Sequence, residues 1–304
     1  LDPQLLEKVM ESINALRLDS DSSLPSAETA DQRALKQVPT DDEYDDFIGN
    51  AKILDEIRKD IDRTFPDLKF FIDPENDLGQ RRYGAMERIL FVWTKCNQGV
   101  KYVQGMNEIV GTIYYVLAND WNVEWAQEAE ADTYWLFHTL VTDIRDIFLP
   151  DMDKDSYGIQ GRIRMMQIML QRHDPEVHNH LHKTGIEYPF FAIRWWTTLL
   201  AREFLLPDTI RLWDSLFASK AKDSFLCYVC ITMLMMIRKR LLECDFSQGL
   251  QLLQDYPSIP MDALLASSKE LYMVESEVAQ LCRSRELTVP QALRSIEHLK
   301  HVIM

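Results

Sequence analysis

Glycine is scarce in this sequence, with ten residues among 304. Few positions can therefore adopt the left-handed turns that a β-rich fold uses often. The sequence also lacks a sustained alternation of apolar and polar residues, and it has no Asn-Gly or Asp-Gly pair to close a hairpin. These absences argue against a sandwich or barrel. They predict an all-α protein with no significant β-sheet.

Basic residues are outnumbered, with 33 Lys and Arg against 48 Asp and Glu and a formal net charge of −15. This balance argues against nucleic-acid binding and against general attraction to anionic lipid. No apolar run approaches the length of a transmembrane segment, and residues 1–11 lack the pattern of a signal peptide. The five cysteines are odd in number and mostly lie in apolar helical patterns, which favours a reducing compartment. We therefore expect a cytoplasmic protein.

Motifs for self-contained chemistry are also missing. The sequence has no glycine-rich phosphate loop, no HExxH and no nucleophile elbow, so it does not resemble a nucleotide-binding enzyme on its own. His178 and His182 share a helix face at zinc-ligand spacing, but only Glu176 accompanies them, and a solvated helix surface is the favoured interpretation. Cys227 and Cys230 form a CxxC inside an apolar segment, which favours core packing over a redox site.

Apolar residues recur at helical spacing along most of the chain. The predicted helices cover residues 1–18, 86–99, 131–148, 158–171, 188–204, 207–217, 223–242, 247–255, 261–282 and 289–300. The acidic run 41–46 favours the start of another helix, because carboxylates oppose the positive end of the helix dipole. Asp174 and Pro175 predict an N-cap followed by a first turn. Residues 223–242 are nearly apolar all round and predict the central core helix.

The helix predicted at 131–148 has a specific expected orientation. Its apolar face is predicted to consist of Trp135, Leu136, Leu140, Ile144 and Ile147. Asp132 or Thr133 is expected to cap its N-terminus.

Two short polar motifs flank the apolar helix predicted at 86–99. The first, IRKDIDRTFP at 57–66, places Asp60 and Arg63 three residues apart on a helix that must end at or before Pro66. The second, YVQGMNE at 102–108, places Gln104 before a glycine. Taken separately, Arg63 is a cation at a helix C-terminus, and Gln104 is a loop residue before a helix that Asn107 caps. Folded onto a common face, the two motifs would present an arginine and a glutamine together.

Together the motifs resemble those of a known family. IRKDIDRTFP is similar to the IxxDxxR motif of TBC domains, and YVQGMN at 102–107 is similar to their YxQ motif. The resemblance covers roughly residues 50 to 260 and continues through AEADTYWLF and FLLPDTIRLWDSLFA. The family's opening helix with Arg and Trp is not recognised in residues 1–50. The resemblance implies a helical domain of two lobes, with an N-terminal segment at 1–49, a lobe carrying both motifs at 50–180 and a C-terminal lobe at 181–304.

TBC domains are the catalytic modules of GTPase-activating proteins for Rab GTPases. The resemblance implies that Arg63 and Gln104 are catalytic residues acting in trans on a GTP-bound Rab protein, in vesicle trafficking. The supporting or partner-binding residues that it implies are Asp60, Thr64, Tyr102, Gly105, Met106 and Asn107. GTP and Mg²⁺ would be held by the partner, and neither a cofactor nor a metal by this chain.

Other functions remain open at this stage. A non-catalytic TBC scaffold would bind a Rab protein or another trafficking partner without accelerating hydrolysis. Such members usually lack one or both of the catalytic residues that the resemblance implies, the arginine finger and the glutamine finger, whereas this sequence retains both as Arg63 and Gln104. A plain helical interaction module would require the motif pair to be accidental. Within the favoured interpretation we expect a cytoplasmic protein recruited peripherally to vesicle or endosomal membranes, with no nucleic-acid partner.

Overall fold

The computed structural model describes residues 41–72, 77–149, 158–219, 221–285, 288, 289 and 291. Within these residues every regular element is an α-helix or a short 3-10 helix, which confirms the all-α prediction. None of the described helices is both long and apolar enough to span a lipid bilayer. The predicted helix at 1–18, and most of the one at 289–300, lie outside the described residues.

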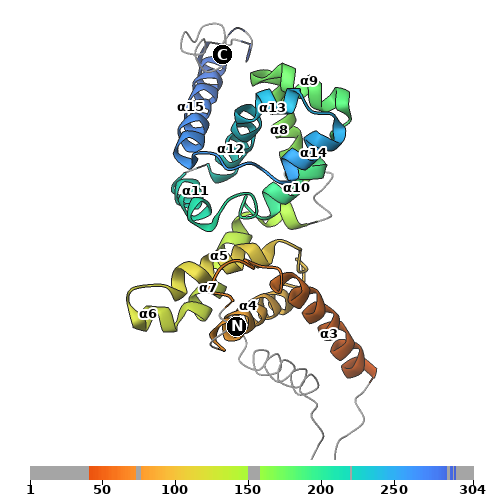
Figure 1. Cartoon of the computed structure of the whole chain (residues 1–304), viewed down its shortest axis with the longest axis vertical. Helices are drawn as coiled ribbons and strands as arrows, with labels where there is room; N and C mark the ends of the chain where they lie inside the picture. The colour runs from red at the N-terminus through yellow and green to blue at the C-terminus, as the bar shows by residue number, and fades with distance from the viewer. Residues whose placement is uncertain are drawn as a thin grey trace, which may run out of the picture. The chain divides into compact units, whose positions relative to one another are not determined.

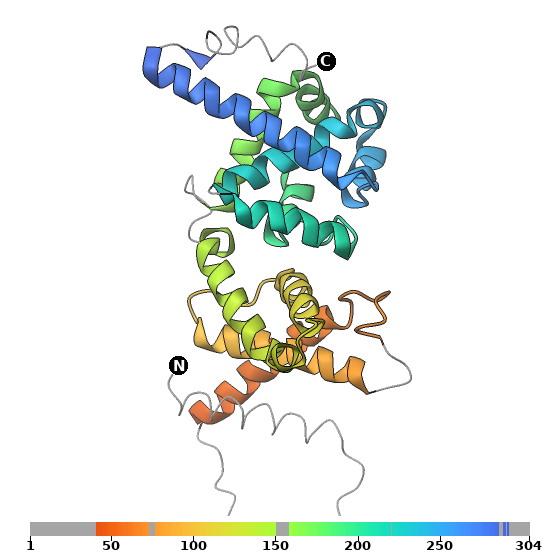
Figure 2. The ribbon, with the colours of Figure 1, turned by 90° about the vertical axis from the view of Figure 1, so that its left-hand side faces the viewer.

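The chain divides into two compact units, Leu1–Ile144 and Arg145–Met304. The lobes expected from the sequence divide at residue 180 instead, and these lobe boundaries stay a prediction. The described helices of the first unit are α3 (Asp41–Ile61), α4 (Leu78–Cys96), α5 (Met106–Ala118), α6 (Val123–Gln127) and α7 (Ala129–Asp143). Helix α5 packs on α7 and α4, and α3 packs on α4 (Figures 1 and 2).

Helix α3 (Asp41–Ile61) includes the acidic run 41–46, which was predicted to lie in a helix. Arg58 and Lys59 lie in its last turn, where cations stabilise the negative end of the dipole. Arg58 also donates two hydrogen bonds of 3.0 Å to the carboxylate of Glu87 on α4. Leu54 and Ile57 on the same helix are buried. The last turn of α3 is therefore held on α4 by apolar packing and a bidentate pair.

The orientation predicted for the helix at 131–148 is partly wrong. Leu140, Ile144 and Ile147 are buried as predicted, but Trp135 and Leu136 are about half exposed. The buried face of α7 also includes Thr133 and Phe137. Neither Asp132 nor Thr133 caps the helix, because α7 begins earlier, at Ala129. Its N-cap is Glu128, whose side chain makes no capping hydrogen bond. Two apolar residues at the edge of a helical stripe were mistaken for its centre.

The second unit is built around one apolar helix. Its elements are η1 (Arg145–Phe148), α8 (Ile159–His173), α9 (Pro175–Thr184), α10 (Pro189–Thr197), α11 (Leu206–Ala218), α12 (Lys222–Met236), α13 (Arg238–Leu242), α14 (Phe246–Gln254) and α15 (Met261–Arg285). Helix α12 packs against α15, α8 and α11 (Figure 1), as the prediction of a central core helix requires. Asp174 caps α9 by accepting from the Val177 amide, and Pro175 occupies the first turn, as predicted.

Three predicted helices are shorter or divided in the structure. The helix expected at 131–148 ends at Asp143, and residues 145–148 form the separate 3-10 helix η1. The helix expected at 188–204 ends at Thr197, because Leu199 and Leu200 adopt φ values of 49° and 63° in a left-handed turn. Both leucines are buried, so packing outweighs the local cost of this conformation. The helix expected at 223–242 is divided at Ile237 into α12 and α13.

Candidate functional site

The first motif forms a tight turn at the end of α3. The amides of Arg63 and Thr64 donate to the carbonyls of Asp60 and Ile61, at 3.2 and 2.9 Å. Phe65 has a φ of 48°, a conformation uncommon for a bulky residue. The proline that follows it disfavours right-handed helical geometry at this position. The turn therefore ends the helix and changes the chain direction just after Arg63.

The Arg63 side chain is held at one end and exposed at the other. Its Nε donates to the carbonyl of Lys59 at 3.0 Å, and its NH2 nitrogen lies 2.5 Å from Asp60 Oδ1. The Arg63 side chain is 65% exposed, whereas that of Asp60 is 10% exposed. A buried carboxylate thus orients a guanidinium whose remaining N–H donors are available to a partner.

Asp60 also connects the two motifs. The Tyr102 hydroxyl donates to Asp60 Oδ2 at 2.7 Å across 42 residues of sequence. Burial and this hydrogen bond raise the pKa of Tyr102 far above its usual value, so the hydroxyl keeps its proton. One carboxylate therefore binds the arginine of the first motif through one oxygen and the tyrosine of the second through the other.

Asn107 forms a second connection between the two motifs. Its Nδ2 donates to Thr64 Oγ1 at 2.8 Å, and its Oδ1 accepts from the Gly105 amide at 3.0 Å. Thr64 Oγ1 in turn donates to the Asp60 carbonyl at 2.9 Å. Both Asn107 and Thr64 are buried. A continuous hydrogen-bonded chain thus fixes the turn after α3 against the loop before α5.

Gln104 projects from that loop. Its side chain is exposed, while Gly105 directly after it is buried. Gly105 is the N-cap of α5 and has a φ of 107°, which side-chain-bearing residues rarely adopt. Asn107 lies inside the first turn of α5, so the prediction that it caps this helix is wrong. Met106 is fully buried. It can therefore support the loop by packing, but its side chain is not exposed to a partner.

The structure thus brings the predicted residues of both motifs into one part of the first unit, with Arg63 and Gln104 exposed. It also adds residues that the sequence did not single out. Tyr83 on α4 donates to the Thr64 carbonyl at 3.0 Å, and the Arg58–Glu87 pair fixes the last turn of α3. Their partners are 19 and 29 residues away, beyond the reach of helical spacing.

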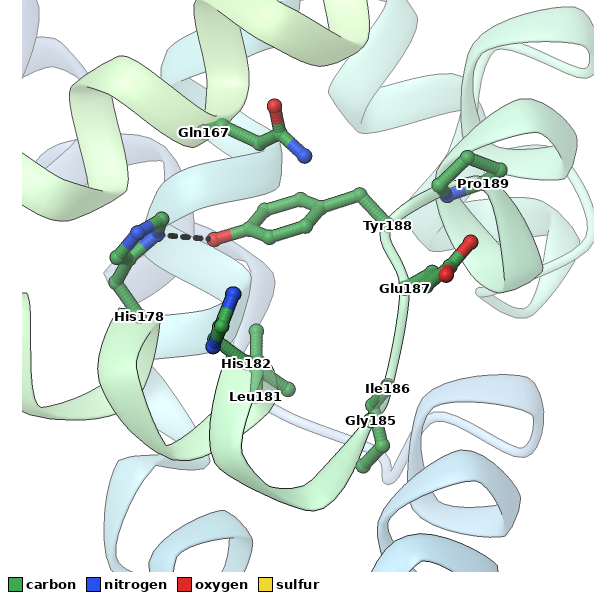
Figure 3. Close-up of a pocket in the computed structure, with 9 residues that line it drawn as sticks. All are labelled: Gln167, His178, Leu181, His182, Gly185, Ile186, Glu187, Tyr188 and Pro189. Carbon is green, nitrogen blue, oxygen red and sulfur yellow. Dashed lines mark hydrogen bonds between the residues drawn. The ribbon is translucent and has the colours of Figure 1, made fainter.

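His178 and His182, the pair weighed as a zinc site from the sequence, line a pocket of 390 Å³ in the second unit. Its lining consists of Gln167, His178, Leu181, His182, Gly185, Ile186, Glu187, Tyr188 and Pro189. Figure 3 shows the Tyr188 hydroxyl directed toward His178, whose Nδ1 lies 3.0 Å away. Burial and His182 lower the pKa of His178.

Among the described residues, no group of three or more His, Cys, Asp or Glu side chains could hold a metal ion. Cys227 and Cys230 are buried in the core, as predicted.

Solved structures show which class of fold this is. The Ypt/Rab-GAP domain of Gyp1p matches with a TM-score of 0.64, at 21% sequence identity, over 90% of this chain and 81% of that one. The TBC domain of a Chlamydomonas flagellar RabGAP matches with a TM-score of 0.55, also at 21% identity, over 89% and 96%. The fold is therefore that of a TBC domain.

Sequence comparison then fixes the family. A family model of the Rab-GTPase-TBC domain matches residues 10–242, and the chain belongs to this family. The match begins inside the segment in which the opening helix was not recognised from the sequence. TBC1 domain family member 13 of Homo sapiens is 47% identical over 192 residues, which are 63% of this chain and 48% of that protein. The chain spans about half the length of this relative. TBC1 domain family member 22B of Homo sapiens is 34% identical over 219 residues, covering 67% of this chain and 41% of that protein.

Proposed function

We propose that this chain is a GTPase-activating protein that accelerates GTP hydrolysis by a GTP-bound Rab-family GTPase, using Arg63 and Gln104 in trans. One observation carries the proposal: the Asp60 carboxylate accepts from Arg63 and Tyr102 at once, which joins the two motifs and leaves both finger side chains exposed. Family membership supports the coarser part, a role of the Rab GAP type.

Arg63 would stabilise the charge that develops on the transferred phosphoryl group. A small GTPase hydrolyses GTP slowly because charge on the γ-phosphoryl oxygens is poorly compensated in its own site. The guanidinium supplies a planar and permanently charged set of donors for those oxygens. An arginine finger of this kind contributes on the order of 10³ to 10⁵ in rate, or about 4 to 7 kcal/mol of barrier.

Gln104 would orient the attacking water. Its amide oxygen can accept from the water while its NH₂ group donates to phosphate, so one neutral side chain serves both contacts. The left-handed turn at Gly105 lets the backbone after Gln104 come close to the partner. GTP and Mg²⁺ would belong to the Rab protein, and we expect no hydrolysis by this chain alone.

The test is single-turnover GTP hydrolysis across a panel of purified Rab proteins. We expect wild type to stimulate one or a few of them, and Arg63→Ala and Gln104→Ala each to abolish most of the stimulation. Arg63→Lys should also fail, because an ammonium cannot reproduce the guanidinium geometry. The matched control is Arg81→Ala, which removes an exposed arginine paired with Asp77 at a similar spacing on α4. This control should keep full activity.

A scaffold role is the second candidate, and the same panel separates it from catalysis. Binding of a Rab protein with no stimulation by wild type would support a scaffold and overturn the catalytic proposal. Stimulation that survives in Arg63→Ala would keep the activity and refute the finger mechanism. A role in vesicle trafficking on cytoplasmic membrane surfaces follows from the Rab partner and is proposed with it.

A further inference from the structure

Three large apolar side chains close together in the sequence are exposed just after α5. Trp121 is 90% exposed, and Val123 and Trp125 on α6 are 68% and 62% exposed. They lie within five consecutive residues, and in Figure 1 α6 is at the edge of its unit. Exposed tryptophans are unusual on a monomer surface, and buried tryptophans dominate binding energy at protein interfaces. We call these three residues the tryptophan surface.

The backbone of the tryptophan surface is fixed by short-range hydrogen bonds. The Asn122 amide donates to Asp120 Oδ1 at 2.7 Å, and Asn122 Oδ1 accepts from the Glu124 amide at 3.0 Å. These bonds order the turn on both sides of Trp121 without covering its ring. A partner would therefore lose little affinity to the ordering of this segment.

Charge decides which partner suits this surface. Residues 119–132 contain five acidic side chains and no Lys or Arg. Within the part of the chain that the structure describes, only Glu130 of the five is paired with an arginine, Arg88. Anionic lipid would be repelled, and a second copy would bring equal negative charge. Residues 1–40 of this chain hold seven acidic and four basic residues, so they do not supply a complementary charge.

The tryptophan surface is also separate from the finger residues. Gln104 precedes the first residues of α5, whereas Trp121 follows the end of the helix. A helix of 13 residues spans about 20 Å at 1.5 Å per residue. The tryptophan surface therefore lies at the opposite end of α5 from the loop that carries Gln104.

We propose that the tryptophan surface binds a basic amphipathic helical segment of another protein. The apolar face of such a segment covers Trp121 and Trp125, and its Lys and Arg residues pair with Glu124 and Glu128 beside them. This proposal does not rest on GTPase activation, and a failure of either proposal leaves the other standing.

The test measures binding of a designed fluorescent peptide of Leu and Lys, about 18 residues long, with Leu on one helical face. A scrambled peptide of the same composition is the probe control. We expect Trp121→Ala with Trp125→Ala to weaken binding at least about tenfold. The matched control, Leu205→Ala with Met273→Ala, removes two apolar residues that are 75% and 60% exposed in the second unit, and should bind as wild type does.

Charge variants test the second half of the proposal. Glu124→Gln with Glu128→Gln should weaken binding and reduce its salt dependence, whereas Glu270→Gln with Glu277→Gln makes the same charge change on α15 and should have little effect. Equal effects of the two pairs, or equal binding of the scrambled peptide, would show general attraction to an acidic protein and overturn the proposal. So would tryptophan-dependent sedimentation with phosphatidylserine vesicles, or a tryptophan-dependent dimer in sedimentation velocity.

Discussion

At the scale of single residues, Asp60 is the group on which the candidate site depends. Its two oxygens bind Arg63 and Tyr102, and its backbone carbonyl accepts from Thr64. The pairing with Arg63 could be predicted from the spacing of three residues on a helix. The contact with Tyr102 could not be derived from local spacing, because the two residues are 42 positions apart and meet only in the folded unit.

Tyr102→Phe tests whether this second contact matters for activity. The substitution keeps the ring and removes the donor to Asp60, so the carboxylate and Arg63 lose one constraint. We expect stimulated hydrolysis to slow on the order of tenfold, which is less than the loss of Arg63 itself. Stability should fall by about 0.5–1.5 kcal/mol. Rates are measured in the single-turnover assay and stability by urea unfolding.

The control for Tyr102→Phe is Tyr256→Phe in the second unit. The Tyr256 hydroxyl is buried and donates to the Met233 carbonyl at 2.8 Å, so its loss has a similar structural cost. We expect this variant to lose stability and keep full activity. If both variants slow hydrolysis equally, the effect of Tyr102 is general destabilisation and not the positioning of Arg63.

At the scale of elements, the site depends on how closely α5 approaches the turn after α3. A Cβ at Gly111 would lie 2.8 Å from Phe65 Cε2 and 3.2 Å from both Met86 Cε and Thr64 Cγ2. Real Cβ atoms essentially never show the shorter distance, so a side chain at this position would force the Phe65 ring or the helix to shift. Arg63 lies two positions before Phe65. The packing of Gly111 against Phe65 therefore affects the position of Arg63.

Gly111→Ala should separate α5 from the turn. We expect a loss of about 1–3 kcal/mol in the free energy of unfolding, because the added methyl group overpacks the contact. Hydrolysis should slow as well, because Thr64 and Asn107 would move apart. Gly49→Ala on α3 is the control: nothing lies within 4 Å of its Cβ, and a helical Gly-to-Ala change stabilises by roughly 0.5–1 kcal/mol. Unfolding and hydrolysis are measured for both variants, and unchanged values for Gly111→Ala would refute this account.

Helix positions were more predictable than helix ends and orientations. The cap of α9 follows from local chemistry, namely an Asp-Pro pair. The early end of α10 at Thr197 does not, because the left-handed leucines after it are stabilised by burial within the unit. The exposed face of α7 was missed for the same reason, since periodicity alone does not show which apolar residues a neighbouring helix will cover.

At the scale of the whole chain, composition was enough to predict an all-α protein, and the motif pair was enough to predict the family. Neither could show the hydrogen bonds that bring the motifs together, which depend on buried Asn107 and half-buried Tyr102. Nor could the sequence distinguish the tryptophan surface from ordinary core residues. Trp195 and Trp196 are fully buried while Trp121 is almost fully exposed, and only tertiary packing separates them.

The dependence of stability on acid pH is a property of the whole chain. The Glu275 carboxylate is one group that contributes to it. Glu275 on α15 is buried and binds His173 Nε2 at 2.7 Å and Arg172 NH1 at 2.6 Å, both on α8. Burial alone would raise the pKa of Glu275, but the hydrogen bonds from His173 and Arg172 outweigh it and lower the pKa below its usual value. A carboxylate with a lowered folded pKa stabilises the protein above its unfolded pKa. This stabilisation is lost as the pH falls through the folded value.

Glu275→Gln should therefore destabilise the protein by about 1–3 kcal/mol at neutral pH, because the charged bonds between α8 and α15 are replaced by weaker neutral ones. The difference from wild type should shrink as the pH falls below the usual carboxyl pKa and through the lowered folded one, where wild type also becomes protonated. Urea unfolding at a series of pH values measures both effects. Glu270→Gln, an exposed change on the same helix, should show neither. A deficit of the same size at every pH would assign the contribution of Glu275 to packing, because only a charge contribution disappears on protonation.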